Sequence, residues 1–154
     1  MRPDALPDLR AAFDGLDGLR RRMVQLALCR HALGVWEAYL QRHGPIEYVD
    51  SVVGLRHRLD STLPRDALAS VEAGVDRAGV AQRYLEPIAA LQDGDLRLPN
   101  QIELAYYAIY NLYRSAFEGA AIDAWLIVNQ ALSAEADPAM WRALLADALL
   151  AARR

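Results

Sequence analysis

The sequence predicts an all-α protein, and composition is the first reason. The chain contains 28 Ala and 24 Leu but only 15 Val plus Ile and a single Thr, so helix formers outnumber the β-branched residues that favour strands. The second reason is the spacing of Pro and Gly, which divides the chain into segments of helical length. We predict one compact domain over residues 1–154, a bundle of six to seven antiparallel helices with residues 1–16 loosely ordered.

The individual helices follow from residues that start or stop a helix. Pro is favoured in the first helical turn, Asp at the N-cap, and Gly just after the last turn. Asp76 is a suitable N-cap for a fourth helix, and Pro87 must restart or kink that helix before Asp93-Gly94-Asp95 ends it. The predicted helices span about 19–42, 45–59, 64–73, 76–85, 100–118, 122–132 and 138–154.

The first long helix, about 19–42, has an unusually wide apolar arc. Such an arc indicates a helix that is central in the bundle or lies at an interface. Cys29 lies on this arc between Leu26 and Leu33, so we expect a buried, inert thiol. Because Cys29 is the one cysteine of the chain, a disulfide scaffold is excluded.

Charge and hydropathy narrow the class of protein. The chain has 17 Arg and no Lys against 20 acidic residues, a formal net charge of −3, which disfavours nucleic-acid binding through bulk positive charge. Its longest apolar run, 124–128, is far shorter than the roughly 18 residues of a membrane span. Residues 1–8 carry acids and prolines in place of a signal peptide. We expect a cytoplasmic protein without membrane contact.

Motifs that carry chemistry are not found. His31, His43 and His57 occur in no spacing typical of metal ligands. The glycine-rich phosphate loops and the nucleophile-elbow motif are also missing from the sequence. We therefore expect no metal site, no cofactor and no catalysis.

The segment 100–114 has the most distinctive composition, with four of the seven tyrosines of the chain within eight positions. On a helix, Tyr106 and Tyr113 fall on the apolar face with Ile102 and Ile109. Their rings are therefore expected in the core, with the hydroxyls at its edge. Tyr107 lies on the opposite face and needs another explanation.

That explanation is a stripe at positions i, i+4, i+7 and i+11, formed by Glu103, Tyr107, Tyr110 and Arg114. We call these four residues the tyrosine stripe. Tyr and Arg are the residue types that anchor protein interfaces, so the stripe predicts a partner-binding face. The alternative is a solvated face with an Arg114–Glu118 ion pair.

Residues 68–84 look like the helix-turn-helix of repressor families. Gly74 would make the turn, Val75 and Val80 would pack, and Arg77, Gln82 and Arg83 would form the recognition face. The surrounding segment 64–90 is net negative, however, and phosphate contacts need the reverse balance. A transcriptional regulator is therefore the second hypothesis.

The segment 100–132 and the compact, acidic, all-helical character of the chain resemble the small helical immunity proteins that bacteria encode beside polymorphic or contact-delivered toxins. The resemblance is one of type and carries over no individual residue. It implies a cognate toxin or effector that is bound with its active site occluded, and no catalysis by the immunity protein itself. Surface acids would oppose a basic toxin cleft, and Asp93 and Asp95 are candidates.

A third hypothesis has two forms. In one, the chain is a helical small-molecule sensor with a pocket near Asn129, a polar residue in the otherwise apolar segment 122–132. In the other, it is a self-associating domain that forms a homodimer through the first long helix.

Overall fold

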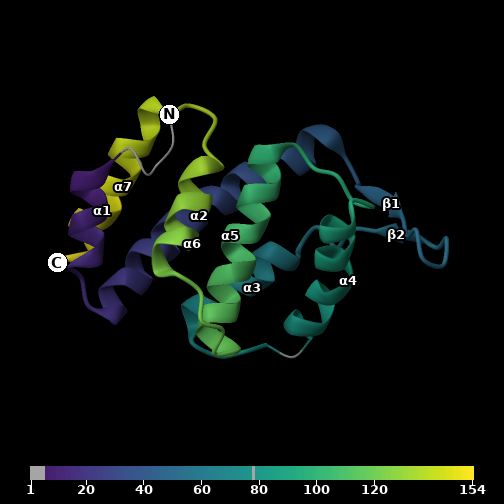
Figure 1. Cartoon of the computed structure of the whole chain (residues 1–154), viewed down its shortest axis with the longest axis horizontal. Helices are drawn as coiled ribbons and strands as arrows, with labels where there is room; N and C mark the ends of the chain where they lie inside the picture. The colour runs from purple at the N-terminus through teal and green to yellow at the C-terminus, as the bar shows by residue number, and fades with distance from the viewer. Residues whose placement is uncertain (1–5, 78) are drawn as a thin grey trace.

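The computed structural model describes residues 6–77 and 79–154 and confirms an all-α bundle that forms a single compact domain (Figure 1). Within these residues the chain forms seven helices and one two-stranded antiparallel sheet. No helix among them is both long and apolar enough to cross a membrane. The elements are α1 (Pro7–Asp14), α2 (Gly18–His43), β1 (Glu47–Val49), β2 (Arg56–Arg58), α3 (Leu63–Ala73), α4 (Val80–Asp93), α5 (Asn100–Phe117), α6 (Ala124–Ser133) and α7 (Ala139–Ala152).

The long helix α2 is central, as its wide apolar arc predicts. It contacts α3, α5, α6 and α7. Trp36 is completely buried, and its indole Nε1 donates a hydrogen bond to the backbone carbonyl of Ser61 at 3.1 Å. Cys29 is also completely buried, as expected. The apolar arc of α2 is therefore covered by other helices of the same chain.

Most helix boundaries lie close to the residues that predict them. Asp17 caps α2 by accepting a hydrogen bond from the Arg20 N–H, and α2 ends before Gly44. Gly74 closes α3 in a left-handed conformation with φ of 68°, which a residue without a Cβ adopts at no steric cost. Asp123 caps α6 through the N–H of Trp125. Local capping chemistry thus accounts for these ends.

The helix predicted over 45–59 is wrong, because this segment forms the β1–β2 hairpin. The Asp50 carboxylate accepts hydrogen bonds from the backbone N–H groups of Val52 and Val53 at 2.7 and 3.2 Å, which also hold the pKa of Asp50 below its usual value. Such local bonds compete with a helix, and β-branched valines favour extended structure. Gly54 completes the turn with φ of 73°.

The predicted start of the fourth helix at Asp76 is also wrong, and Pro87 does not restart the helix. α4 begins at Val80 after Gly79, and Asp76 does not cap it. The Asp76 carboxylate instead accepts a hydrogen bond from the Tyr113 hydroxyl at 2.5 Å, so a tertiary contact outweighs the local capping preference. α4 runs through Pro87 as one helix, and the Pro87 ring is buried in the core, where its packing offsets the lost backbone hydrogen bond.

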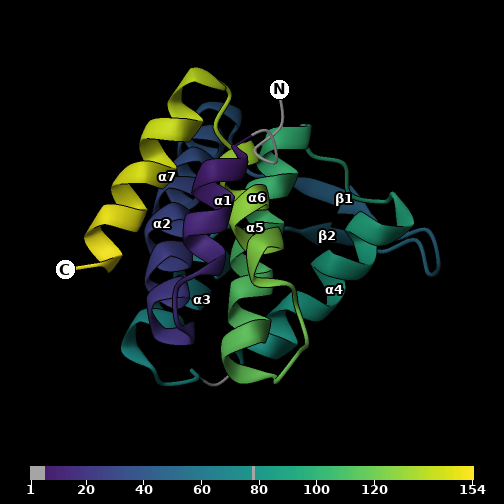
Figure 2. The same cartoon turned by 60° about the vertical axis from the view of Figure 1, so that its left-hand side comes forward.

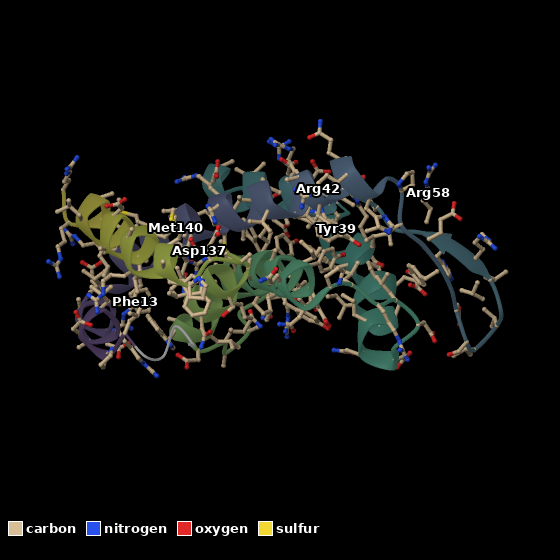
Figure 3. The ribbon with its side chains drawn as sticks, turned by 90° about the horizontal axis from the view of Figure 1, so that it is seen from above. Phe13, Tyr39, Arg42, Arg58, Asp137 and Met140 are labelled. Atoms are coloured by element: carbon tan, nitrogen blue, oxygen red, sulfur yellow. The ribbon has the colours of Figure 1, made fainter. Side chains whose placement is uncertain are left out.

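The loosely ordered N-terminal segment predicted over 1–16 is wrong for residues 7–14, which form α1; residues 1–5 lie outside the described part. Phe13 is completely buried and packs against Trp125 of α6, with ring centroids 5.7 Å apart. α1 also contacts α7, and Figure 3 shows Phe13 at the end of the molecule opposite the hairpin. Tertiary burial of one aromatic ring orders a helix too short to be stable alone.

The substitution Phe13→Ala tests this packing. We expect it to lower the free energy of unfolding by about 3 to 5 kcal/mol, because it removes a fully buried ring and leaves a cavity. Urea denaturation followed by circular dichroism measures the change. The matched control is Leu19→Ala, since Leu19 is 73% exposed and should change stability by no more than about 0.5 kcal/mol. Equal effects of the two substitutions would contradict the docking of α1.

Candidate functional site

Three of the four residues of the tyrosine stripe line a groove between α4, α5 and α6. The groove has a volume of about 520 Å³ and is open to solvent. Its lining residues are Leu85, Ile88, Ala89 and Gln92 from α4, Tyr107, Tyr110, Asn111 and Arg114 from α5, and Gln130 from α6. We call it the α4–α5 groove. These three side chains therefore border a solvent-open groove and do not point into the core.

The groove exists because tyrosine rings separate α4 from α5. Tyr84 of α4 is completely buried and packs against Tyr106 and Tyr110 of α5, with ring centroids 5.6 and 4.7 Å apart. Tyr113 lies on the other side of the same ring at 6.2 Å. These aromatic contacts lie beside the groove, which α4, α5 and α6 border; Figure 2 shows how these three helices are arranged.

The hydroxyls of Tyr106 and Tyr113 are both expected at the edge of the core, and the structure agrees for one of them. Tyr106 and Tyr113 are core residues as predicted, but only the Tyr113 hydroxyl reaches a partner at the edge of the core. The Tyr106 and Tyr84 hydroxyls are buried and have no hydrogen-bond partner among the described residues. Burial raises the pKa of both phenols well above the usual value, so both remain protonated.

The charged end of the stripe is preorganised. The Arg114 guanidinium carbon lies 5.3 Å from the centre of the Tyr110 ring, within the range of a cation–π contact. Arg114 Nε also lies 3.5 Å from the Glu118 carboxylate, which is the ion pair expected of a solvated face. Yet Tyr107, Tyr110 and Arg114 are all half-buried in the groove. The ion pair expected of a solvated face is therefore present, although these three side chains are only partly exposed.

Two amides form the polar part of the groove. The Asn111 side chain is 8% exposed and donates a hydrogen bond from Nδ2 to Gln130 Oε1 at 2.9 Å. This bond joins α5 to α6 directly beneath the groove. The two amide side chains therefore offer a partner hydrogen-bonding groups whose positions are fixed in advance.

The remaining predicted site residues lie apart from the groove. Glu103 is half-buried one turn before Tyr107, and burial, with help from the Glu103 charge, raises the pKa of Tyr107. Asp93 is exposed at the end of α4. Asp95 is half-buried, and its carboxylate accepts bonds from the backbone N–H and the hydroxyl of Ser51, both at 3.0 Å. Exposure therefore supports Asp93 as a contact residue more than Asp95.

The helix-turn-helix residues are arranged less favourably than the sequence suggests. Arg83 is held between two carboxylates, with Nε 2.8 Å from Asp60 and an Nη 2.9 Å from Asp66. Val75, expected to pack, is 64% exposed, whereas Val80 is buried as expected. Arg83, which lies on the second helix of the expected motif (α4), is thus already paired with two carboxylates of the same chain.

The residues of the third hypothesis also have defined surroundings. Asn129 is half-buried, and its side-chain oxygen accepts a hydrogen bond from the Ser133 hydroxyl at 3.2 Å. The next residue, Gln130, borders the α4–α5 groove, and Asn129 does not. Of these two residues, Gln130 is therefore the one placed to contact a ligand in this groove.

A second polar cluster was missed by sequence reasoning. Asp50 and His57 of the hairpin and Glu86 of α4 place one ligand atom each within 4.8 Å of the others. Histidine spacing could not predict it, because the three residues come from two elements that are remote in sequence. No spacing along the chain signals the cluster, because the hairpin brings Asp50 and His57 together and the packing of α4 adds Glu86.

The α4–α5 groove is the feature of the described chain that best combines aromatic rings, a cation and fixed amides, the composition of a recognition surface. Its volume falls in the range of ligand and peptide sites. In comparisons with models of protein families, with curated proteins and with solved structures, no significant match to this chain was found.

The burial of Cys29 makes its thiol a poor nucleophile. Complete burial raises the pKa of its thiol to about 12. We therefore expect the folded protein to resist a thiol-specific disulfide reagent at pH 8, because almost no thiolate is present and the sulfur is inaccessible. The same chain in denaturant should react at the rate of a free cysteine. Rapid labelling of the folded chain would contradict the burial.

Proposed function

We propose that this chain is a non-catalytic protein-binding domain, a cytoplasmic immunity protein that binds a cognate bacterial toxin through the α4–α5 groove and occludes its active site. The observation that carries the proposal is the position of Tyr107, Tyr110 and Arg114 together in an open groove. A core role would bury them, and an incidental surface role would leave them dispersed.

The chemistry of the groove supports a protein partner. Tyr107 and Tyr110 offer large aromatic contact area at a low cost in conformational entropy, and their rings pack edge to face 6.4 Å apart. Leu85, 64% exposed at the side of the groove, adds apolar surface that a partner could bury. Preorganisation by Tyr84 and Glu118 lowers the entropy lost on binding.

Charge supports a basic partner. The chain has a net charge of −3, and Asp93 is exposed one residue beyond Gln92 of the groove. An acidic surface speeds encounter with a basic cleft, as would be found in a toxin that cleaves nucleic acid. Occlusion requires no chemistry from the immunity protein.

The double substitution Tyr107→Ala with Arg114→Ala tests the groove. We expect binding to the toxin domain encoded beside this gene to weaken by about 30-fold or more, or about 2 kcal/mol, because both side chains are interface anchors. Calorimetric titration of purified toxin domain measures affinity, and circular dichroism checks that the helices persist.

The matched control is Tyr39→Ala with Arg42→Ala on α2. It removes the same two residue types from a helix whose Tyr39 and Arg42 lie outside the groove (Figure 3). Tyr39 stacks on His43 and is half-buried, so the loss of packing is comparable. Unchanged toxin affinity in the groove variant, or an equal loss in both variants, would refute the proposed interface.

A second candidate function is a small-molecule sensor that uses the same groove. The fixed Asn111–Gln130 amide pair beneath two tyrosine rings favours it, because apolar walls with a few fixed polar groups are typical of ligand sites. A thermal-shift screen of aromatic amides and nucleobases should then raise the melting temperature of the wild-type chain but not of Tyr107→Ala. A screen without any such shift would refute the sensor.

A further inference from the structure

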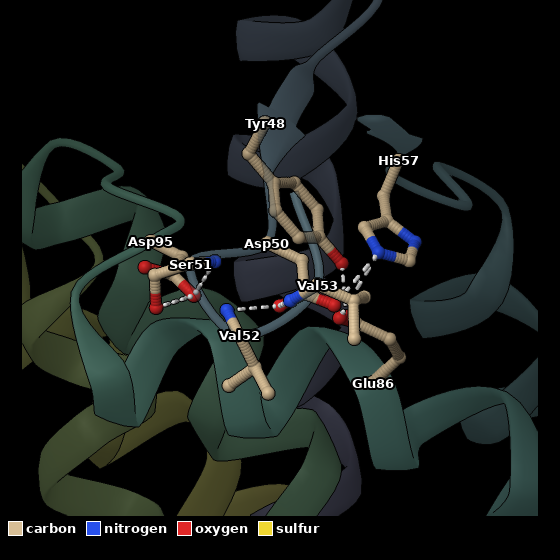
Figure 4. A network of polar contacts seen from close by, with 8 residues as sticks. All are labelled: Tyr48, Asp50, Ser51, Val52, Val53, His57, Glu86 and Asp95. Carbon is tan, nitrogen blue, oxygen red and sulfur yellow. Dashed lines mark hydrogen bonds and ion pairs between the residues drawn. The ribbon is translucent and has the colours of Figure 1, made fainter. Parts of the chain in front are cut away.

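The Asp50, His57 and Glu86 side chains converge where the hairpin meets α4 (Figure 4). His57 Nε2 lies 3.5 Å from one carboxylate oxygen of Asp50 and 3.5 Å from one of Glu86. This nitrogen is buried and makes no hydrogen bond to any described residue. Three ligand atoms thus face one point, and the imidazole nitrogen there has two carboxylates within ion-pair distance but makes no hydrogen bond.

Each carboxylate of this cluster divides its two oxygens in the same way. Asp50 Oδ1 accepts from the Val52 and Val53 N–H groups, whereas Oδ2 faces His57. Glu86 Oε2 accepts from the Tyr48 hydroxyl, whereas Oε1 faces His57. One oxygen is therefore fixed by the protein and the other is left to the shared point. Metal sites show this arrangement, in which outer hydrogen bonds orient the ligating groups.

The spacing fits a small cation. Ligand atoms about 2.0 to 2.1 Å from a tetrahedral ion lie roughly 3.4 Å from one another. The two separations from His57 Nε2 are 3.5 Å, and all three ligand atoms lie within 4.8 Å of one another. Charge fits as well. Two carboxylates and a neutral imidazole carry −2, which a divalent cation neutralises, whereas a protonated His57 would compensate only half of it.

We propose that Asp50, His57 and Glu86 bind a divalent transition-metal ion of the Zn²⁺ type, which fastens the β1–β2 hairpin to α4. The imidazole nitrogen favours such ions over Mg²⁺ and Ca²⁺, which prefer oxygen ligands alone. The carboxylates come from a β-turn and a helix, so the ion joins two elements that few other contacts connect. None of the three residues lines the α4–α5 groove.

A fourth coordination position has room for water. A pocket of about 190 Å³ borders Tyr48, His57 and Glu86. With three protein ligands, Zn²⁺ completes its tetrahedron with a water molecule from such a pocket. Arg58 and Arg83 also line this pocket, so an anion could replace that water.

Calorimetric titration of the chelator-treated full chain with ZnSO₄ tests the site. We expect saturable binding of one Zn²⁺ per chain and no comparable binding of Mg²⁺. His57→Ala and Glu86→Gln should each weaken Zn²⁺ affinity at least 100-fold. Co²⁺ should give the visible absorption of a tetrahedral nitrogen–oxygen site in the wild-type chain and lose it in both variants.

The control is His43→Ala, which removes an exposed histidine outside the cluster. It should leave Zn²⁺ affinity unchanged. Glu86→Gln keeps the proposal testable if His57→Ala fails to fold, because Glu86 is 43% exposed and the amide preserves its shape. Absence of saturable Zn²⁺ binding to the wild-type chain, equal binding by wild type and Glu86→Gln, or loss of binding in His43→Ala would overturn the proposal.

Tyr48→Phe separates a built site from surface adsorption. The Tyr48 hydroxyl donates to Glu86 and touches no ion in the proposed geometry, so it is a positioning residue. Its removal should weaken Zn²⁺ affinity about 10-fold, the lower range for outer hydrogen bonds of metal ligands. Adding Zn²⁺ should raise the melting temperature of wild type more than that of Tyr48→Phe. Identical affinities would overturn the oriented-ligand geometry.

Discussion

One column of aromatic packing holds the described structure together. Trp36, buried at the centre of α2, packs on Tyr106 of α5 with ring centroids 5.0 Å apart. Tyr106 meets Tyr84 of α4 edge to face, and Tyr84 in turn supports Tyr110 at the groove. The central helix therefore determines where α4 lies, and α4 determines both the width of the groove and the position of Glu86.

This column has an energetic cost. The hydroxyls of Tyr84 and Tyr106 are buried without a hydrogen-bond partner among the described residues, and each such group costs about 1 to 3 kcal/mol. The rings offset this cost through their apolar area and mutual packing. α4 is thus joined to α5 mainly by ring contacts, which hold the distance between the helices without closing the groove.

Local signals predicted most helix ends, whereas non-local contacts contributed to the errors at 45–59 and at Asp76. Gly44, Gly74 and Asp123 act within one turn of the chain, so their capping roles could be read from the sequence. Gly44-Pro45 fits either the end of a helix before a hairpin or the start of a new helix, and packing of Tyr48 beneath α4 decides between them. Asp76 is a suitable N-cap by its local sequence, but its carboxylate accepts a hydrogen bond from Tyr113, 37 residues away.

The two candidate sites also differ in how far the sequence could predict them. The tyrosine stripe lies on one helix, so helical periodicity located it, although its groove depends on α4 and α6 and could not be foreseen. The Asp50–His57–Glu86 cluster joins two elements, and no spacing along the chain announces it. Asp95 was chosen for expected exposure, but its contact with Ser51 ties the loop after α4 to the hairpin turn (Figure 4).

The pairing of α1 with α7 bears on how the chain folds during its synthesis. Arg142 of α7 donates two hydrogen bonds of 3.0 and 3.2 Å to the carboxylate of Asp8 in α1, 134 positions away, and α7 also covers part of α2. α7 is made after α1 to α6, so the side of α2 that α7 covers stays exposed until α7 has been made. This order of synthesis leaves apolar surface of α2 transiently open to chaperones.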